Sequence, residues 1–551
     1  MNNSLKKLIE DSLVEALGEQ NNLPPIYITQ PKKKERGDLS TNLPFSLSRK
    51  TGEPASKIGE KLTFLLKEKD FLSKVEFIPP GFLNFFISSE FLAHTLKNIL
   101  LQRKNFASFS YGEGKKVHID FVSANPTGPL HIGHARGAAI GDSLANILSK
   151  VGYDVKREYY ICDLGGQIER LSHSVYIRLQ ELQGKKVSFP EDGYKGDYIV
   201  EIARKAKEIL KEELSIKKGE KELLSLLRKF TVEEILRDIK KDLEDFGVKY
   251  DSWFTESALY KNKEIFKTID ELQKRNFTYE KDGALWFKTS LFLKNERDRV
   301  LRRKNGEYTY LARDISYHQN KLSRNFERMI DVWGQDHIGQ APCLKAAVEA
   351  LDRSHRGPEI IIYQFVTLMR EGKKVSASTR EGKFIPLREV LEEIGKDIAR
   401  FFFVSSSRDT HLKFDLKLAK KQSPENPVFY IQYAHARICS IFKKAEERGI
   451  RLENPEKAKL TLLVEPEEIE LAKKMSLYPD AVQESADTLE PHRLVSYLEE
   501  LAALFHQFYT KHRVINDDRE LTLARLYLIE AVKIVIEDIL ALLGISAPRM
   551  M

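Results

Sequence analysis

The chain has 551 residues, of which 42% are hydrophobic and 31% are charged, and its formal net charge is +8. This is the composition of an ordinary globular protein of about three domains, not of a fibrous or low-complexity chain. The mild basic excess is compatible with a nucleic-acid partner but does not identify one.

Cysteine usage and the distribution of apolar residues indicate the compartment. Cys162, Cys343 and Cys439 lie far apart in the chain, and they form neither a metal-ligand spacing nor a disulfide framework, which favours a reducing cytosol. No apolar run approaches the ~20 residues of a membrane span, and the N-terminus lacks the apolar region of a signal peptide. We therefore expect a cytoplasmic protein with no membrane association and no tightly bound metal.

The N-terminal segment is predicted to be a small α+β domain. Residues 5–17 place apolar side chains on one helical face. Residues 74–87 alternate apolar residues around a Pro-Pro-Gly turn, which predicts a hairpin. The basic run Lys32–Lys34 fits a solvated loop and a phosphate-backbone contact equally well.

A strand, a loop, a helix and a second strand follow. Residues 115–122 form a short apolar run, residues 138–152 have helical spacing, and residues 153–161 are a second strand candidate. This order begins a parallel sheet with crossover helices. The loop delivers His131 and His134 to the helix N-terminus, the place where open parallel sheets bind anionic ligands.

The two histidines have a spacing suited to phosphate chemistry. His131 and His134 are three residues apart, so they lie on one side of the first helical turn. Gly133 between them lets a nucleotide approach the backbone closely. Two imidazoles here can donate hydrogen bonds to a phosphate whose charge grows in a transition state. The alternative, two exposed histidines on an ordinary helix, is disfavoured by the strand, loop and helix around them.

The segment A-N-P-T-G-P-L-H-I-G-H resembles the signature of class I aminoacyl-tRNA synthetases, in the form used by arginyl-tRNA synthetases. The resemblance implies an α/β protein with three parts: an N-terminal α+β appended domain over 1–108, a Rossmann-type parallel-sheet catalytic domain over 109–390 with a helical insertion at about 170–285, and an all-α anticodon-binding bundle over 391–551. The signature residues are Ala124, Asn125, Pro126, Thr127, Gly128, Pro129, Leu130, His131, Ile132, Gly133 and His134.

The segment Y-L-A-R-D is the candidate for amino-acid recognition. Tyr310 and Asp314 are four residues apart and share a helical face. From the residues alone, Asp314 also fits a helix cap or a surface ion pair. The family carries Y-x-x-x-D here, facing the substrate guanidinium, which needs carboxylates and an aromatic face. The resemblance implies arginine-binding roles for Ser123, Asn125, Glu256, Tyr310, Asp314, Gln335 and Asp336.

The second half of the sheet is expected beyond residue 327. Residues 328–337 predict a strand and a loop, residues 338–352 a helix, and residues 359–368 one buried strand. By resemblance, His337 in this loop faces the nucleotide.

A loop over 371–387, rich in Lys, Ser and Gly, can close on a triphosphate. The family's K-M-S-K aligns with residues 376–379, so Thr379 replaces the last lysine, as in many arginyl-tRNA synthetases. The cationic group is then supplied by Lys374, Arg380 or Lys383. The resemblance implies catalytic roles for His131, Gly133, His134, Lys374 and Arg380, and ATP-binding roles for His131, His134, His337, Ser378, Thr379 and Lys383.

From Asn426 the chain is predicted to be helical to its end, with Pro427 in the first turn of a helix. This part resembles the family's anticodon-binding bundle. The implied reaction is ATP-dependent ligation of L-arginine to tRNA through arginyl-adenylate, by a monomer that uses ATP with Mg²⁺.

Two other functions stay open. A small-molecule adenylyltransferase can use H-x-G-H, but it would not need the C-terminal helical third. A non-catalytic tRNA-binding relative is favoured by the altered residues 376–379 and disfavoured by the intact His131, Gly133 and His134.

Overall fold

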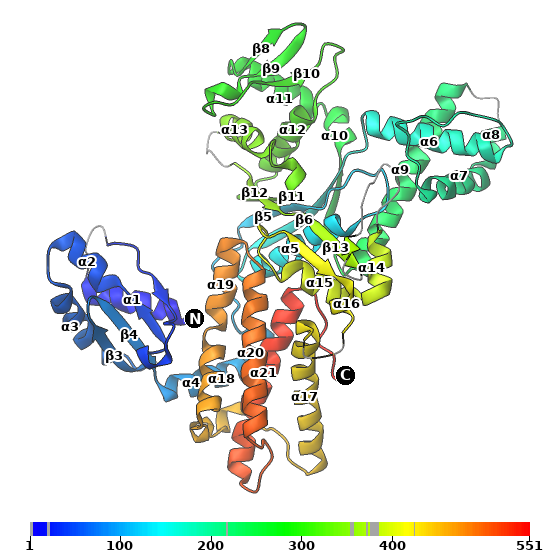
Figure 1. Cartoon of the computed structure of the whole chain (residues 1–551). Coiled ribbons are helices and arrows are strands. Elements are labelled where there is room, and N and C mark those ends of the chain that lie inside the picture. The colour runs from blue at the N-terminus through cyan, green and yellow to red at the C-terminus, as the bar shows by residue number, and fades with distance from the viewer. Residues whose placement is uncertain are drawn as a thin grey trace. The chain divides into compact units, whose positions relative to one another are not determined.

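The computed structural model describes residues 4–18, 23–215, 219–352, 357–370, 373–374, 385–421, 423 and 425–551. The chain folds into two compact units (Figure 1). One comprises Met1–Phe109, Gln422–Leu542 and Ser546–Met551, and the other comprises Ser110–Lys421 and Leu543–Ile545.

A five-stranded sheet organises the second unit. Its order is β12-β11-β5-β6-β7, and all neighbouring strands run parallel. The chain leaves the central strand β5 towards β6 and returns on its other side as β11, which creates a topological switch point between β5 and β11. The strands are β5 (Lys116–Phe121), β6 (Asp154–Ile161), β7 (Ser252–Thr255), β11 (Arg328–Gly334) and β12 (Glu359–Tyr363).

Helix α5 (Ile132–Lys150) lies very close to this sheet because glycines face it. A Cβ on Gly141 would lie 2.3 Å from the Phe121 ring, and one on Gly137 would lie 2.7 Å from the Tyr363 hydroxyl. The small residues after the two histidines therefore serve close packing of helix on strand. The helix extends the one predicted at 138–152 back to the signature histidines.

The described residues between β6 and β7 form helices that gather in one group (Figure 1). They are α6 (Gly166–Leu182), α7 (Asp197–Ile209), α8 (Lys211–Ser215) and α9 (Glu220–Asp245). Because β7 then rejoins the parallel sheet, the helical insertion expected at about 170–285 is interrupted by a strand. We refer to residues 166–245 as the helical insertion from here on.

A second excursion lies between β7 and β11. It contains α10 (Glu256–Lys261), α11 (Glu264–Lys274) and α12 (Tyr310–Ser323), with an antiparallel sheet of β8 (Thr278–Lys281), β9 (Ala284–Phe287) and β10 (Arg299–Arg302). Helix α13 (Ala341–Leu351) follows β11, as predicted.

The prediction of a single strand over residues 359–368 is wrong. The structure has two strands, because β12 ends at Tyr363 and β13 (Val366–Arg370) joins another sheet with β14 (Lys373–Lys374) and β15 (Leu412–Asp415). At the break, the Gln364 carbonyl accepts a hydrogen bond from the buried Arg136 guanidinium at 2.7 Å. The unit is completed by α14 (Leu387–Ile394), α15 (Lys396–Val404) and α16 (Leu416–Ala419).

The first unit combines the two ends of the chain. Its N-terminal part has a sheet of order β1-β2-β4-β3, and β3 and β4 form the predicted hairpin. The Asp480 carboxylate of the C-terminal part accepts hydrogen bonds from the backbone N–H of Leu5 at 3.2 Å and of Lys6 at 3.1 Å. The N-terminal elements are α1 (Leu5–Leu17), β1 (Ile28–Thr29), β2 (Leu39–Thr41), α2 (Leu43–Thr51), α3 (Ala55–Leu66), β3 (Leu72–Ile78), β4 (Phe82–Ile87) and α4 (Ser89–Gln102).

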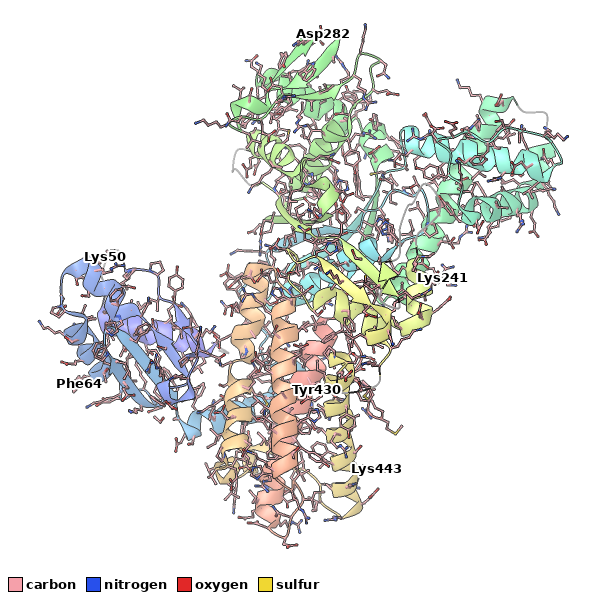
Figure 2. The ribbon with its side chains drawn as sticks, in the orientation of Figure 1. Lys50, Phe64, Lys241, Asp282, Tyr430 and Lys443 are labelled. Atoms are coloured by element: carbon pink, nitrogen blue, oxygen red, sulfur yellow. The ribbon has the colours of Figure 1, made fainter. Side chains whose placement is uncertain are left out.

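The C-terminal part of this unit is helical, as predicted. It comprises α17 (Pro427–Glu447), α18 (Pro466–Ser476), α19 (Tyr478–Thr488), α20 (His492–Lys511) and α21 (Arg519–Leu542). The Asn426 side chain caps α17 by accepting from the Val428 N–H at 3.2 Å. Tyr430, labelled in Figure 2, projects from α17, and its ring centre lies 4.3 Å from that of His506. Across the described part of the chain, none of the helices is long and apolar enough to cross a membrane.

Candidate active site

A cavity of about 430 Å³ lies where the strands of the parallel sheet end. It lies at the switch point beside β5 and β11, where ligands of open parallel sheets bind. The lining includes nine of the residues predicted to bind substrates or to act in catalysis: Ser123, Asn125, His131, Gly133, His134, Tyr310, Asp314, Asp336 and His337.

The two signature histidines form a stacked pair at the N-terminus of α5. Their ring centres are 3.8 Å apart. The His131 Nδ1 accepts from the Gly133 N–H at 3.1 Å, and the His134 Nδ1 accepts from the His131 N–H at 3.3 Å. Burial lowers the pKa of both imidazoles. Both rings are therefore neutral at pH 7, and each carries its proton on Nε2 as a donor.

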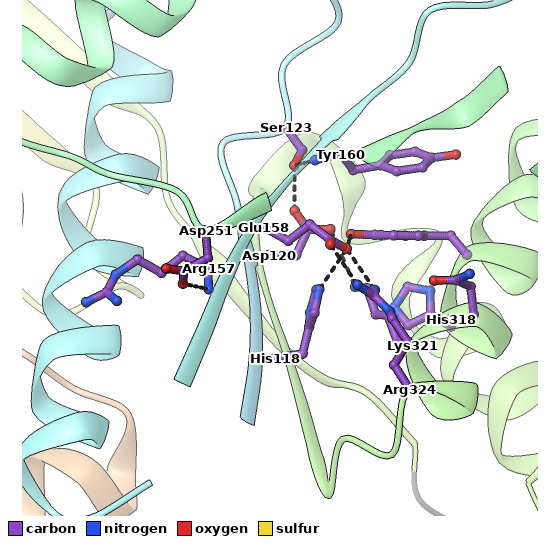
Figure 3. Close-up of polar contacts among 12 residues, drawn as sticks. His118, Asp120, Ser123, Arg157, Glu158, Tyr160, Asp251, His318, Lys321 and Arg324 are labelled. Atoms are coloured by element: carbon purple, nitrogen blue, oxygen red, sulfur yellow. Dashed lines mark hydrogen bonds and ion pairs between the residues drawn. The ribbon is translucent and has the colours of Figure 1, made fainter. Parts of the chain in front are cut away.

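The backbone turns sharply between β5 and the signature loop. Val122 and Ser123 both have left-handed backbone conformations, with φ of 69° and 35°, which is unusual for non-glycine residues. The Ser123 hydroxyl stabilises this turn, because it donates to Asp120 and accepts from the Tyr160 N–H at 2.9 Å (Figure 3). Burial raises the pKa of Asp120 to about 6, although Lys321 opposes the shift.

One face of α12 supplies the opposite wall. Tyr310, Asp314, Tyr317 and His318 all line the cavity. Burial raises the pKa of the Asp314 carboxyl well above its usual range, and the nearby Glu256 raises it further. An approaching cation would lower this pKa again, so the wall favours a positively charged ligand.

A buried ion-pair network supports that wall from behind. The Lys321 ammonium donates to Asp331 at 2.6 Å, and the His318 Nε2 lies 2.7 Å from the other Asp331 carboxylate oxygen. The His318 Nδ1 contacts the Asp314 carbonyl at 2.7 Å. The network thus connects β11 to the backbone of the residue expected to bind the substrate guanidinium.

Glu158 on β6 is the centre of a second cluster, shown in Figure 3. It accepts two hydrogen bonds from Arg324 at 2.8 Å, one from Tyr317 at 2.7 Å and a contact from the His118 Nε2 at 2.9 Å. Burial alone would raise the pKa of Glu158, but Arg324 and His118 hold it well below its usual range. Burial lowers the pKa of His118 to about 4. The cluster fixes the ring of Tyr317 in the cavity wall.

Some predicted residues do not line the cavity. Glu256 is fully buried, accepts a hydrogen bond from Arg313 at 2.6 Å, and lies 3.4 Å from the Tyr160 hydroxyl in the wall. Gln335 begins a short 3₁₀ helix (Gln335–His337), of which Asp336 and His337 line the cavity. Among the signature residues, Pro126, Leu130 and Ile132 do not line the cavity.

The predicted ATP-binding loop falls largely outside the described residues. Ser378, Thr379, Arg380 and Lys383 are not among them, and neither is the side chain of Lys374. Within the described ranges, no group of three or more His, Cys, Asp or Glu side chains could hold a metal ion.

The cavity also contains residues that the motifs did not indicate. They include Asp120, Tyr160, Tyr194, Tyr198, Tyr317, His318, Trp333, Tyr363 and Phe365. A signal for two of them was present in the sequence, because Tyr310, Asp314, Tyr317, His318 and Lys321 fall on one helical face that is polar and aromatic instead of aliphatic. Tyr194 and Tyr198 belong to the helical insertion, which no local pattern places at the sheet.

Three features together define a class I aminoacyl-tRNA synthetase. They are the parallel sheet with a switch point, the H-x-G-H segment at the helix N-terminus beside it, and the C-terminal helical bundle. Three family models match the chain: arginyl tRNA synthetase N terminal domain over residues 3–87, tRNA synthetases class I (R), catalytic domain, over 95–415, and DALR anticodon binding domain over 431–551. Enzymes of this class use ATP as a substrate.

Sequence similarity to arginine–tRNA ligases extends over 96–100% of the chain. The arginine–tRNA ligase of Desulfosudis oleivorans is 47% identical over 531 residues, covering 96% of this chain and 95% of the relative. That of Syntrophotalea carbinolica is 43% identical over 556 residues, covering 100% of both. The solved arginyl-tRNA synthetase of Thermus thermophilus shares the fold, with a TM-score of 0.81 at 23% identity, covering 99% of this chain and 100% of that one. The chain belongs to the arginyl-tRNA synthetase family.

Proposed function

We propose that this chain carries out the reaction of its family, the ATP-dependent ligation of L-arginine to tRNA through arginyl-adenylate, in the cavity described above. One observation carries the assignment of the site. The same cavity joins two neutral imidazole donors at a helix N-terminus, His131 and His134, to a buried carboxyl and a phenol on α12, Asp314 and Tyr310. The first pair suits a phosphate and the second suits a guanidinium.

In the first step, the arginine carboxylate attacks the α-phosphorus of ATP, and the bond to the pyrophosphate oxygen breaks. His131 and His134 donate from Nε2 to the phosphate oxygens as negative charge grows there. One such donor is typically worth about 3–4 kcal/mol. Gly133 keeps the approach open, because a Cβ at this residue would lie 2.9 Å from the His131 ring.

The pyrophosphate side of the reaction is assigned to residues 374–383. Lys374 and Arg380 supply positive charge to the leaving group, and Ser378, Thr379 and Lys383 contact the triphosphate, which arrives as its Mg²⁺ complex. His337 faces the nucleotide. The support for these roles is the order of the signature segments along the chain.

Recognition of arginine is assigned to the wall built by α12 and β5. Asp314 accepts from the guanidinium and Tyr310 covers its face, since a planar cation needs both kinds of partner. Ser123, Asn125, Gln335 and Asp336 hold the amino-acid end. Glu256 acts from behind the wall, through the Tyr160 hydroxyl at 3.4 Å.

In the second step, a terminal ribose hydroxyl of the tRNA attacks the acyl carbon and AMP leaves. No protein nucleophile is required, so the protein contributes positioning and electrostatic stabilisation. The assignment also includes a three-domain organisation with bounds at 1–108, 109–390 and 391–551, and a monomeric state. It further includes a cytoplasmic location, with which the free thiols of Cys162, Cys343 and Cys439 agree.

Charging of arginine tRNA with labelled arginine tests the proposal. The wild-type protein should form arginyl-tRNA, and Asp314→Asn should reduce kcat/KM for arginine by roughly ten- to a hundredfold, the scale expected for losing a hydrogen bond to a charged group. Asp270→Asn, on an exposed surface of α11, is the matched control. Equal charging by Asp314→Asn would refute the site assignment, and binding of tRNA without any charging would support the non-catalytic alternative, which no comparison favours.

A further inference from the structure

The helical insertion contributes two aromatic side chains to the active-site cavity. Tyr194 lies just before α7 and Tyr198 lies in its first turn, and both line the cavity together with the signature residues. The Tyr198 hydroxyl donates a hydrogen bond to the Thr127 carbonyl at 2.8 Å. The insertion therefore contacts the middle of the loop between Asn125 and His131.

Steric contact accompanies this hydrogen bond. A Cβ on Gly128 would lie 3.2 Å from both Cζ and the hydroxyl oxygen of Tyr198, which is closer than an ordinary van der Waals contact. The absence of a side chain at residue 128 thus allows the phenol to approach the loop. Burial raises the pKa of Tyr198 well above its ordinary value, so the hydroxyl keeps its proton and can donate at neutral pH.

Further hydrogen bonds hold the two ends of the loop. Near its start, the Tyr159 hydroxyl donates to the Ala124 carbonyl at 2.9 Å, and the Asn125 amide donates to Gln167 of α6 at 2.9 Å. At its end, the Leu130 carbonyl accepts a backbone hydrogen bond at 2.7 Å from the N–H of Leu387, the first residue of α14. Tyr198 thus holds the loop midway between the residue assigned to the amino acid and the residues assigned to the phosphate.

We propose that Tyr198 is a positioning residue for adenylate formation, through which the helical insertion keeps Asn125 and His131 at the separation that the reaction needs. This inference rests on the proposed function of the cavity. The physical reason is that the loop fixes one substrate at each of its ends, and a misplacement of about 1 Å between reacting groups can cost on the order of a hundredfold in rate.

Tyr198→Phe removes the hydroxyl and keeps the ring, so it isolates the hydrogen bond. We expect the kcat of arginine-dependent ATP–pyrophosphate exchange, measured with tRNA present, to fall about tenfold, the upper end of what one hydrogen bond contributes. KM for arginine and for ATP should stay within about twofold, and the fall in the midpoint of urea unfolding should be too small to unfold the enzyme under assay conditions. Tyr176→Phe, the same change on α6 of the insertion, is the control and should keep the wild-type kcat.

A second variant pair separates positioning from general loss of structure. Gly128→Ala should reduce kcat when the Tyr198 ring is present, because the new Cβ meets it. In a Tyr198→Ala background the same change should cost much less, since the ring is gone.

Three outcomes bear on the inference differently. A wild-type kcat for Tyr198→Phe, or equal costs of Gly128→Ala in both backgrounds, would overturn it and leave the proposed function intact. A fall in the unfolding midpoint that accounts for the lost rate would also overturn it. Absence of exchange by the wild-type enzyme would instead refute the proposed function.

Discussion

The Arg313 guanidinium donates to the Glu256 carboxylate at 2.6 Å, and the Glu256 side chain has no exposed surface. An internal guanidinium thus neutralises one carboxylate behind the cavity wall, while the neighbouring Asp314 faces the cavity. The Arg313–Glu256 pair is therefore a structural element of the wall, and Asp314 is the carboxyl of α12 that lines the cavity.

Breaking this pair should destabilise the fold. Arg313→Met leaves a buried carboxylate without its partner, so we expect a loss of about 3 kcal/mol in the free energy of unfolding. The double variant Glu256→Gln/Arg313→Met should lose less than the sum of the two single variants, as urea unfolding would measure. Strict additivity would show that the two side chains do not depend on each other.

The signature histidines should be needed for rate more than for binding. Replacing His131 or His134 by Ala removes a donor to the growing phosphate charge, so kcat of ATP–pyrophosphate exchange should fall about 10²–10³-fold. His94→Ala on α4 serves as the control. A rise in KM for ATP with kcat unchanged would instead mean that the imidazoles contribute equally to ground-state and transition-state binding.

The pH dependence of the free energy of unfolding should show the opposing effects of two residues of β5, His118 and Asp120. The pKa of His118 falls from 6.5 to about 4 on folding, so its contribution favours the native state above pH 6.5 and is lost as the pH falls towards 4. The pKa of Asp120 rises from 3.8 to about 6, so its contribution has the opposite sign in nearly the same range. Each contribution is about 3 kcal/mol at full extent.

Asp120→Asn should therefore make the free energy of unfolding fall more steeply between pH 6.5 and 4 than it does in the wild type. Urea unfolding at three pH values in this window measures the slope. A variant with the wild-type slope would show that Asp120 does not bind a proton in the folded protein within this range.

The signature loop could be predicted from the sequence because its chemistry is contiguous. Strand 116–121, the two histidines and the helix after them follow one another along the chain, so local patterns define the phosphate side of the site. The spacing of Tyr310 and Asp314 likewise placed them on one helical face, and the structure puts both in the cavity.

The rest of the cavity depends on long-range contacts that local patterns do not specify. Asp120 sits in a strand that is buried from Val117 to Phe121, and the packing of α12 brings the Lys321 ammonium to 3.5 Å from its carboxylate. Tyr198 comes from an insertion whose dense charge indicates only a solvated face. The division of residues 359–368 into β12 and β13 could not be predicted from local patterns either, because the Gln364 carbonyl at the break bonds to Arg136, which lies far away in the sequence.

Gln167 should affect arginine affinity through Asn125. Its side-chain oxygen accepts from the Asn125 amide at 2.9 Å and so orients the group assigned to the amino-acid end. Gln167→Ala should raise KM for arginine about tenfold with KM for ATP nearly unchanged, which corresponds to about 1.4 kcal/mol. Equal increases in both KM values would contradict a role confined to Asn125.

Lysine should be rejected strongly as a substrate. A site built for a planar guanidinium would leave buried polar groups unpaired around an ammonium, and discrimination of this kind reaches roughly 10⁴–10⁵ in kcat/KM. Competition between the two amino acids in the exchange assay measures the ratio. Comparable kcat/KM values would refute the assigned arginine pocket.

Activation of arginine with ATP is the reaction assigned to this cavity. Its most direct test is ATP–pyrophosphate exchange by the purified wild-type protein, run separately with each of the standard amino acids, with and without arginine tRNA. We predict exchange with arginine alone among them, abolished by His131→Ala/His134→Ala. Exchange with another amino acid, exchange that survives the double variant, or none at all from protein that still binds tRNA would contradict the assignment.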